Sequence, residues 1–95
     1  MFDKVKDVYN LQKQARQLKK ELKNTHIEAE VDGVTVLIDG EQEVVSVSIS
    51  EEAGQNPKRL PESLVKAFNK AIKKSQQIAA EKMKPLMGSL NMPGL

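Results

Sequence analysis

Side chains that could carry out catalysis are few in this 95-residue chain. It contains no cysteine and a single histidine, His26, and therefore offers no thiol nucleophile, no cysteine-rich zinc site and no histidine cage for a metal. Paired carboxylates occur at Glu28 and Glu30 and at Glu51 and Glu52, but a solvated strand face or a loop also places acids in such pairs. No G-x-S-x-G and no phosphate-cradling glycine loop is present. We expect no enzyme, no cofactor, no metal site and no small-molecule substrate.

Positive charge is abundant and is sorted along the chain. Residues 1–24 hold seven basic and three acidic side chains, residues 25–52 hold eight acidic and no basic ones, and residues 53–95 hold eight basic and two acidic ones. The segments thus carry +4, −8 and +6, which gives the net charge of +2. Two basic flanks around an acidic middle favour a domain whose ends face a polyanion. The alternative is that the charges only solvate helix surfaces.

The kind of basic residue narrows the choice of polyanion. Lysine supplies 13 of the 15 basic side chains, and its compact charge suits phosphates, whereas only Arg16 and Arg59 have the fork that reads guanine edges. Phe2, Tyr9 and Phe68 are the only aromatic residues, so unpaired bases have almost no stacking platform. The composition favours contact with the backbone of a duplex and weak sequence preference.

Helical periodicity predicts where the first group of these charges lies. A 3-4-3-4 spacing of apolar or small side chains predicts an amphipathic helix over residues 3–23, with the stripe Val8, Leu11, Ala15, Leu18 and Leu22. At 100° per residue, Lys13 and Lys20 fall opposite this stripe and Arg16 and Lys23 fall on one flank. One face of the helix is apolar and the other is positive.

After Asn24 the period changes to two, which predicts strands. Apolar residues alternate with polar ones over 27–31 and 45–49, and Asp32-Gly33 is typical of a tight hairpin turn. Residues 34–38 place Val34, Val36 and Ile38 on one face and Thr35 and Leu37 on the other. We expect a three-stranded antiparallel meander with one face packed on helices and the other toward water.

A second long helix is expected to begin at Pro61 and to end at Pro85, after a loop over 51–60 with one helical turn following Pro57. Its predicted buried stripe includes Leu64, Val65, Phe68, Ala71, Ile72, Ser75, Ile78 and Ala79 and reaches Met83. We expect a single domain over residues 1–84 and a flexible tail over residues 85–95.

The expected fold class is α+β, in the order α-β-β-β-α. Helices of about 22 residues span roughly 33 Å, whereas strands of six or seven residues span about 20–24 Å. The helices should overhang the sheet, and a second copy related by a two-fold axis would cover their apolar stripes. The alternative is that the helices pack within one chain and the remaining stripe stays exposed.

Two blocks are more distinctive than the lysine-rich helix: Val-Thr-Val-Leu-Ile-Asp-Gly at 34–40 and Leu-Val-Lys-Ala-Phe-Asn-Lys-Ala at 64–71. Together with the opening Met-Phe, Val-Ser-Val-Ser-Ile at 45–49 and Glu-Lys-Met at 81–83, they resemble the YbaB/EbfC family of bacterial nucleoid-associated proteins over nearly the whole chain. The resemblance implies a tight homodimer with protruding helices that binds double-stranded DNA and affects nucleoid organisation and gene regulation. Many relatives have a glycine-rich stretch between the first two strands, which is reduced here to Asp32-Gly33.

The sequence therefore predicts a homodimer that binds duplex DNA through its lysine faces, in the cytoplasm at the nucleoid. The expected DNA contacts are Lys13, Arg16, Lys20 and Lys23 on the first helix and Lys66, Lys70, Lys73 and Lys74 on the last. A dimeric cytosolic adaptor for a protein partner is the alternative. No membrane partner is expected, because a surface-bound helix needs bulky apolar side chains that are required here for the core, and no run approaches the roughly 20 apolar residues of a membrane span.

Overall fold

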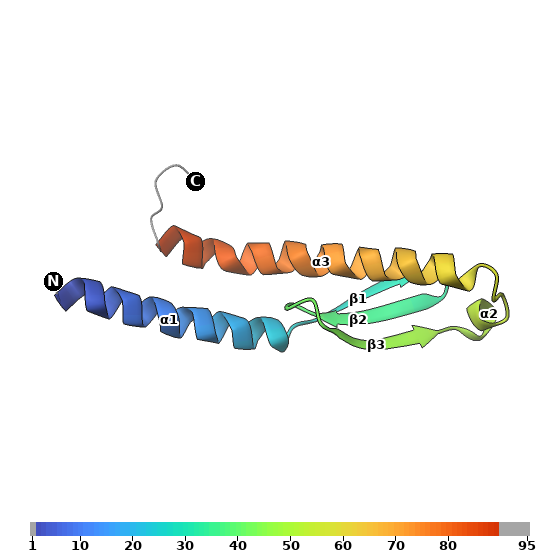
Figure 1. The fold of residues 1–95 in the computed structure, drawn as a ribbon, viewed down its shortest axis with the longest axis horizontal. Coiled ribbons are helices and arrows are strands. Elements are labelled where there is room, and N and C mark those ends of the chain that lie inside the picture. The colour runs from blue at the N-terminus through green and yellow to red at the C-terminus, as the bar shows by residue number, and fades with distance from the viewer. Residues whose placement is uncertain (1, 90–95) are drawn as a thin grey trace.

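The chain runs from one long helix through a three-stranded sheet into a second long helix (Figure 1). The structure is a computed structural model that describes residues 2–89, with side chains described for residues 8–86. Its elements are α1 (Phe2–Lys23), β1 (His26–Val31), β2 (Val34–Asp39), β3 (Val44–Ile49), α2 (Glu51–Gly54) and α3 (Leu60–Ser89). The expected α+β class and the α-β-β-β-α order are confirmed, with α2 as a short addition.

The sheet is an antiparallel meander in the order β1-β2-β3, as predicted. Asp32 and Gly33 join β1 to β2 with φ angles of 49° and 83°, the pair of positive values that a two-residue hairpin turn requires. Val31 pairs with Val34 and closes this hairpin, and Ala29 pairs with Val36. The pairing of β2 with β3 includes a register shift between Leu37 and Ile38.

Helix α3 packs on one face of the sheet through small side chains. Ala67 and Ala71 are fully buried with Val36 and Ile38 of β2 and with Ala29 of β1. Small residues let the helix backbone approach the strands closely, so the centre of the contact lies on the alanine row. The predicted stripe is wrong at two positions, because Val65 on the flank of α3 is 60% exposed and Met83, toward the end of the helix, is 40% exposed.

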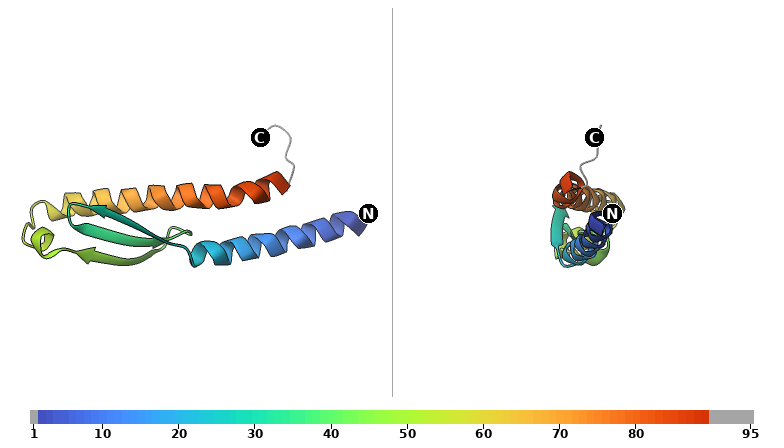
Figure 2. Two further views of the ribbon diagram at one scale, coloured as in Figure 1. Left: turned by 180° about the vertical axis from the view of Figure 1, so that it is seen from behind. Right: turned by 90° about the vertical axis from the view of Figure 1, so that its left-hand side faces the viewer.

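Strand β3 is not covered by any helix, which corrects the expectation that all three strands pack on helices. Its apolar side chains Val44, Val45, Val47 and Ile49 are 40–49% exposed. A helix is about 10 Å wide and strands lie about 4.8 Å apart, so one helix covers two strands. Helix α3 lies over β1 and β2 and leaves β3 beside it (Figures 1 and 2).

Both long helices extend beyond the sheet, as the length argument predicts. Helix α1 leaves the end of the sheet and runs beside the C-terminal half of α3 (Figures 1 and 2), and the molecule is 65 Å long but only 26 and 13 Å across. Near the sheet, Lys82 Nζ lies 2.8 Å from Glu21 Oε1 and joins the two helices. No helix in the described part of the chain is long and apolar enough to cross a bilayer.

Two predicted boundaries, the start and the end of the long helix, need correction. The long helix begins at Leu60 and continues through Pro85 to Ser89, although a proline in a helix interior removes one N–H donor and crowds the preceding turn. The expected turn after Pro57 is present, with the N–H groups of Arg59 and Leu60 donating to the Asn56 carbonyl, and α2 is an additional turn before it, capped where Ser50 Oγ accepts from the Ala53 N–H at 3.1 Å. Of the predicted tail, residues 90–95 lie outside the described residues.

Candidate nucleic-acid interface

A row of exposed cations follows α1 on the side opposite its apolar stripe. Lys13, Arg16, Lys20 and Lys23 are all exposed, while Leu22 is buried. Their spacing of three, four and three residues keeps them within roughly 80° of one another at 100° per residue. We call these four residues the α1 row.

The charge of the α1 row is not neutralised by nearby acids. Within residues 8–86 none of its four members forms an ion pair, and Glu21, an acid on the same helix, is engaged by Lys82 instead. Lys20 and Lys23 lie in the last turn of α1, where cations are stabilised by the helix dipole. The α1 row therefore presents positive charge on a face that a polyanion can approach.

Sequence reasoning overlooked one aromatic member of this face. Tyr9 lies four residues before Lys13, which extends the spacing of the α1 row by one turn, and its side chain is 60% exposed. The 4-3-4-3 spacing was itself the available signal. A tyrosine hydroxyl can donate a hydrogen bond to a phosphate, so this position is chemically compatible with the cations beside it.

On α3, Lys66 and Lys73 project into solvent over the sheet. Lys66 Nζ is 3.3 Å from Glu62 Oε1, one turn earlier, with both side chains more than half exposed. Such an exposed pair contributes about 0.2–1 kcal/mol, so it leaves Lys66 free to exchange its partner. Lys73 is exposed and has no ion pair in the described part of the chain.

Lys70 and Lys74, the other two predicted contacts on α3, are bound to the sheet. Lys70 Nζ donates to the backbone carbonyl of Glu30 at 3.2 Å, and Lys74 Nζ donates to that of Glu28 at 3.1 Å. Lys74 is also half-buried. The structure therefore separates the predicted α3 lysines into two that face solvent and two that contact β1.

The α1 row and the α3 lysines are not brought together in one chain. The four predicted α3 lysines fall within residues 66–74, on the part of α3 that lies over the sheet. Residues 9–23 of α1 lie beyond the end of the sheet (Figure 1). Lys84, which the predicted contacts do not include, is exposed on the part of α3 that runs beside α1. A single copy therefore offers two separate basic regions.

The two pairs of acids that might suggest catalysis lie on different elements. Glu28 and Glu30 are exposed on β1, and Glu51 and Glu52 form the first turn of α2. His26 is exposed at the start of β1. In the part of the chain that the structure describes, no three histidine or acidic side chains are placed to hold a metal ion.

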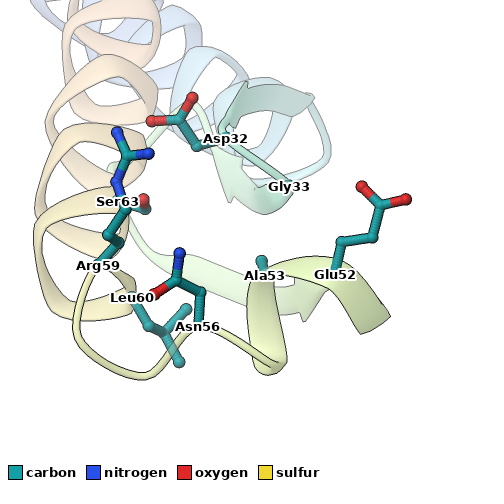
Figure 3. A pocket seen from close by; sticks show the side chains of 8 residues that line it. All are labelled: Asp32, Gly33, Glu52, Ala53, Asn56, Arg59, Leu60 and Ser63. Atoms are coloured by element: carbon teal, nitrogen blue, oxygen red, sulfur yellow. The ribbon is translucent and has the colours of Figure 1, made fainter.

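One cavity lies at the end of the molecule away from α1, between the β1–β2 turn, α2 and the start of α3 (Figure 3). It has a volume of about 380 Å³ and is lined by Asp32, Gly33, Glu52, Ala53, Asn56, Arg59, Leu60 and Ser63. The Asp32 carboxylate lies on the same side as the Arg59 guanidinium, and Glu52 points away from both. Because both acidic and basic side chains line this cavity, it does not favour the binding of a polyanion.

The family model and the similar proteins point to the same family. The model of the YbaB/EbfC DNA-binding family matches residues 1–90. A nucleoid-associated protein of Syntrophobacter fumaroxidans is 34% identical over 99% of this chain and 89% of its own length. One of Pelotomaculum thermopropionicum is 33% identical over 100% of this chain and 94% of its own length.

A solved structure has the same fold. The crystal structure of the uncharacterized protein HP0035 from Helicobacter pylori superposes with a TM-score of 0.66 and 20% sequence identity, covering 78% of this chain and 90% of that one. The α-β-β-β-α arrangement is therefore a known architecture.

Proposed function

This chain belongs to the YbaB/EbfC DNA-binding family, and from that premise we propose that it is a nucleoid-associated protein whose homodimer binds double-stranded DNA with little sequence preference. Its contacts are made by lysine-rich helix faces to the phosphate backbone. Its place is the cytoplasm, at the nucleoid, where it affects DNA organisation and gene regulation. Catalysis and small-molecule substrates have no part in this proposal.

The α1 row is the observation on which this proposal depends. From Lys13 to Lys23 the helix rises roughly 15 Å at 1.5 Å per residue, and over that length a duplex presents about nine phosphate charges. The row is exposed and is free of ion pairs within residues 8–86. Three of its four members are lysine, which supports backbone contact over base reading. Tyr9 extends the same face.

A second copy is proposed because one copy leaves apolar surface uncovered. Val47 and Ile49 on β3 are 40% and 46% exposed, and Val65 on α3 is 60% exposed. We call these three residues the apolar corner. An exposed cluster of large aliphatic side chains marks an interaction surface more often than a solvated one. A two-fold dimer that covers the apolar corner would also double the basic regions.

Titration of a labelled duplex at two salt concentrations tests the proposal. Backbone contact requires that log K falls linearly with log salt, with a slope of about −0.9 for each phosphate contacted. Duplexes of unrelated sequence should bind with similar affinity. Absence of duplex binding at micromolar protein would instead support the alternative expectation, a dimeric adaptor for a protein partner, which family membership does not favour.

A further inference from the structure

We propose that Lys70 and Lys74 close the β1 edge of the sheet against strand addition, and that this closure limits assembly of the chain to a pair of copies. The sheet has two edge strands, β1 on one side and β3 on the other. The free edge of a strand carries unpaired N–H and C=O groups that can pair with another chain. The two edges of this sheet differ in how those groups are treated.

Hairpin register shows that the two lysines bind the outward carbonyls of β1. Val31 and Val34 flank the two-residue turn and form a hydrogen-bonded pair. Pairs alternate along an antiparallel ladder, so Glu28 and Glu30 are in the non-hydrogen-bonded pairs and direct their backbone groups away from β2. These are the carbonyls that accept from Lys74 and Lys70.

The distance between the two lysines along α3 matches the distance between the two carbonyls along β1. Lys70 and Lys74 are four residues apart on α3, a rise of roughly 6 Å, and Glu28 and Glu30 are two residues apart on β1, a rise of roughly 6.8 Å. One lysine therefore meets each outward carbonyl. An incoming strand would need to displace both ammonium groups to form its own ladder.

Strand β3 has none of this protection. By the same alternation, Val47 and Ile49 direct their backbone groups away from β2, because Thr35 and Leu37 face their β3 partners Ser48 and Ser46. Residues 44–49 carry no charge, and no side chain in the described part of the chain donates a hydrogen bond to them. This edge adjoins the apolar corner. The β3 side is therefore the side on which a second copy docks.

The asymmetry has a consequence for assembly that rests on the proposed homodimer. A chain that self-associates through one surface forms a closed two-fold dimer. A chain that associates through two different surfaces can form open-ended arrays. The exposed acids Glu28 and Glu30 add like-charge repulsion if two β1 edges meet. Closure of β1 thus keeps the sheet from extending.

The test replaces both lysines with methionine, which retains the aliphatic stem and removes the donor. We expect K70M/K74M to form species whose mass exceeds twice the 10.6 kDa of one chain and rises with concentration in sedimentation velocity. The matched control K66M/K73M removes the same charge from the same helix and should remain a pair. K70R/K74R, which keeps donors at both positions, should also remain a pair.

Equal masses for K70M/K74M and K66M/K73M, with far-ultraviolet circular dichroism showing both folded, would overturn the closure. If K70M/K74M does not fold, the single variant K74M frees one carbonyl and is compared with K73M by the same measurement. An unaltered chain that sediments as a monomer contradicts the homodimer instead. In that case closure is still judged by whether K70M/K74M associates while K66M/K73M does not.

Discussion

The hydroxyl of Ser75 on α3 donates a hydrogen bond of 2.7 Å to the backbone carbonyl of Asp39 at the end of β2. The carboxylate of Asp39 in turn accepts from the backbone N–H groups of Glu41 and Glu43 at 2.8 and 3.0 Å. The next residue, Gly40, donates its N–H to the carbonyl of Leu22 at the end of α1 at 2.8 Å. One turn therefore ties α1, the sheet and α3 together, and it sets the direction in which α1 leaves the sheet.

Loss of the Ser75 hydroxyl should destabilise the fold. Ser75 is fully buried, and S75A would leave the Asp39 carbonyl with the Gln42 N–H, 3.1 Å away, as its remaining donor. Because the carbonyl keeps that second donor, the loss is that of one hydrogen bond, about 0.5–1.5 kcal/mol, and we expect a decrease of that size in the free energy of unfolding measured with urea. S48A on the exposed strand β3 is the control and should change it by less than about 0.5 kcal/mol. Equal effects would contradict the role of this hydrogen bond.

A side chain at Gly40 should disturb α1 more than the sheet. A Cβ placed there would lie 2.7 Å from the Leu22 carbonyl oxygen and 3.0 Å from the Leu22 Cα, which is backbone and cannot rotate away. We expect G40A to lower stability and to increase amide hydrogen exchange at the C-terminal end of α1. The matched control is G54A, whose Cβ would meet nothing closer than 4.0 Å. Unchanged exchange in α1 would show that the junction tolerates the shift.

Charge reversal on the α1 row should weaken duplex binding. K13E/K20E reverses two exposed lysines, and each lost phosphate contact should reduce the steepness of the salt dependence by about 0.9. The control K58E/R59E makes the same change of charge at exposed positions near the other end of the molecule. Fluorescence anisotropy with a labelled duplex compares them. An equal loss of affinity in both variants would mean that net charge, and not the α1 row, governs binding.

Tyr9 should report duplex binding through its own emission. It is the only tyrosine and the chain has no tryptophan, so intrinsic fluorescence arises from this exposed position on the face of the α1 row. We expect unlabelled duplex to change the emission and to saturate at the stoichiometry seen by anisotropy. K13E/K20E should show the change only at higher DNA concentration. Saturated binding with constant emission would remove Tyr9 from the contact face.

A charge in the apolar corner should separate the two copies. Val47 is 40% exposed in one chain, and burying a carboxylate at this position in a dimer is strongly unfavourable. We expect V47E to sediment as a folded monomer. S48E, on the opposite face of the same strand, is the control and should remain a dimer. A dimeric V47E would place the contact elsewhere.

Local sequence was sufficient for much of this molecule. The two faces of α1 follow from helical periodicity, which depends on residues three and four apart, and the β1–β2 turn follows from Asp32-Gly33, whose types tolerate positive φ. Alternation over 27–31 and 34–38 likewise predicts the face of β1 and β2 that α3 covers. In each case, the feature is determined by residues that are close together in the sequence.

Tertiary structure decided what these local patterns do not encode. Alternation marks β3 as having an apolar face, but the width and position of a single helix leave that face uncovered. The helical pattern places Lys66, Lys70, Lys73 and Lys74 on α3 as equivalent cations, yet Lys70 and Lys74 bind carbonyls that are 40 and 46 residues away in sequence. Which lysines remain free depends on how α3 is oriented across the sheet, and that orientation results from contacts between residues far apart in the chain.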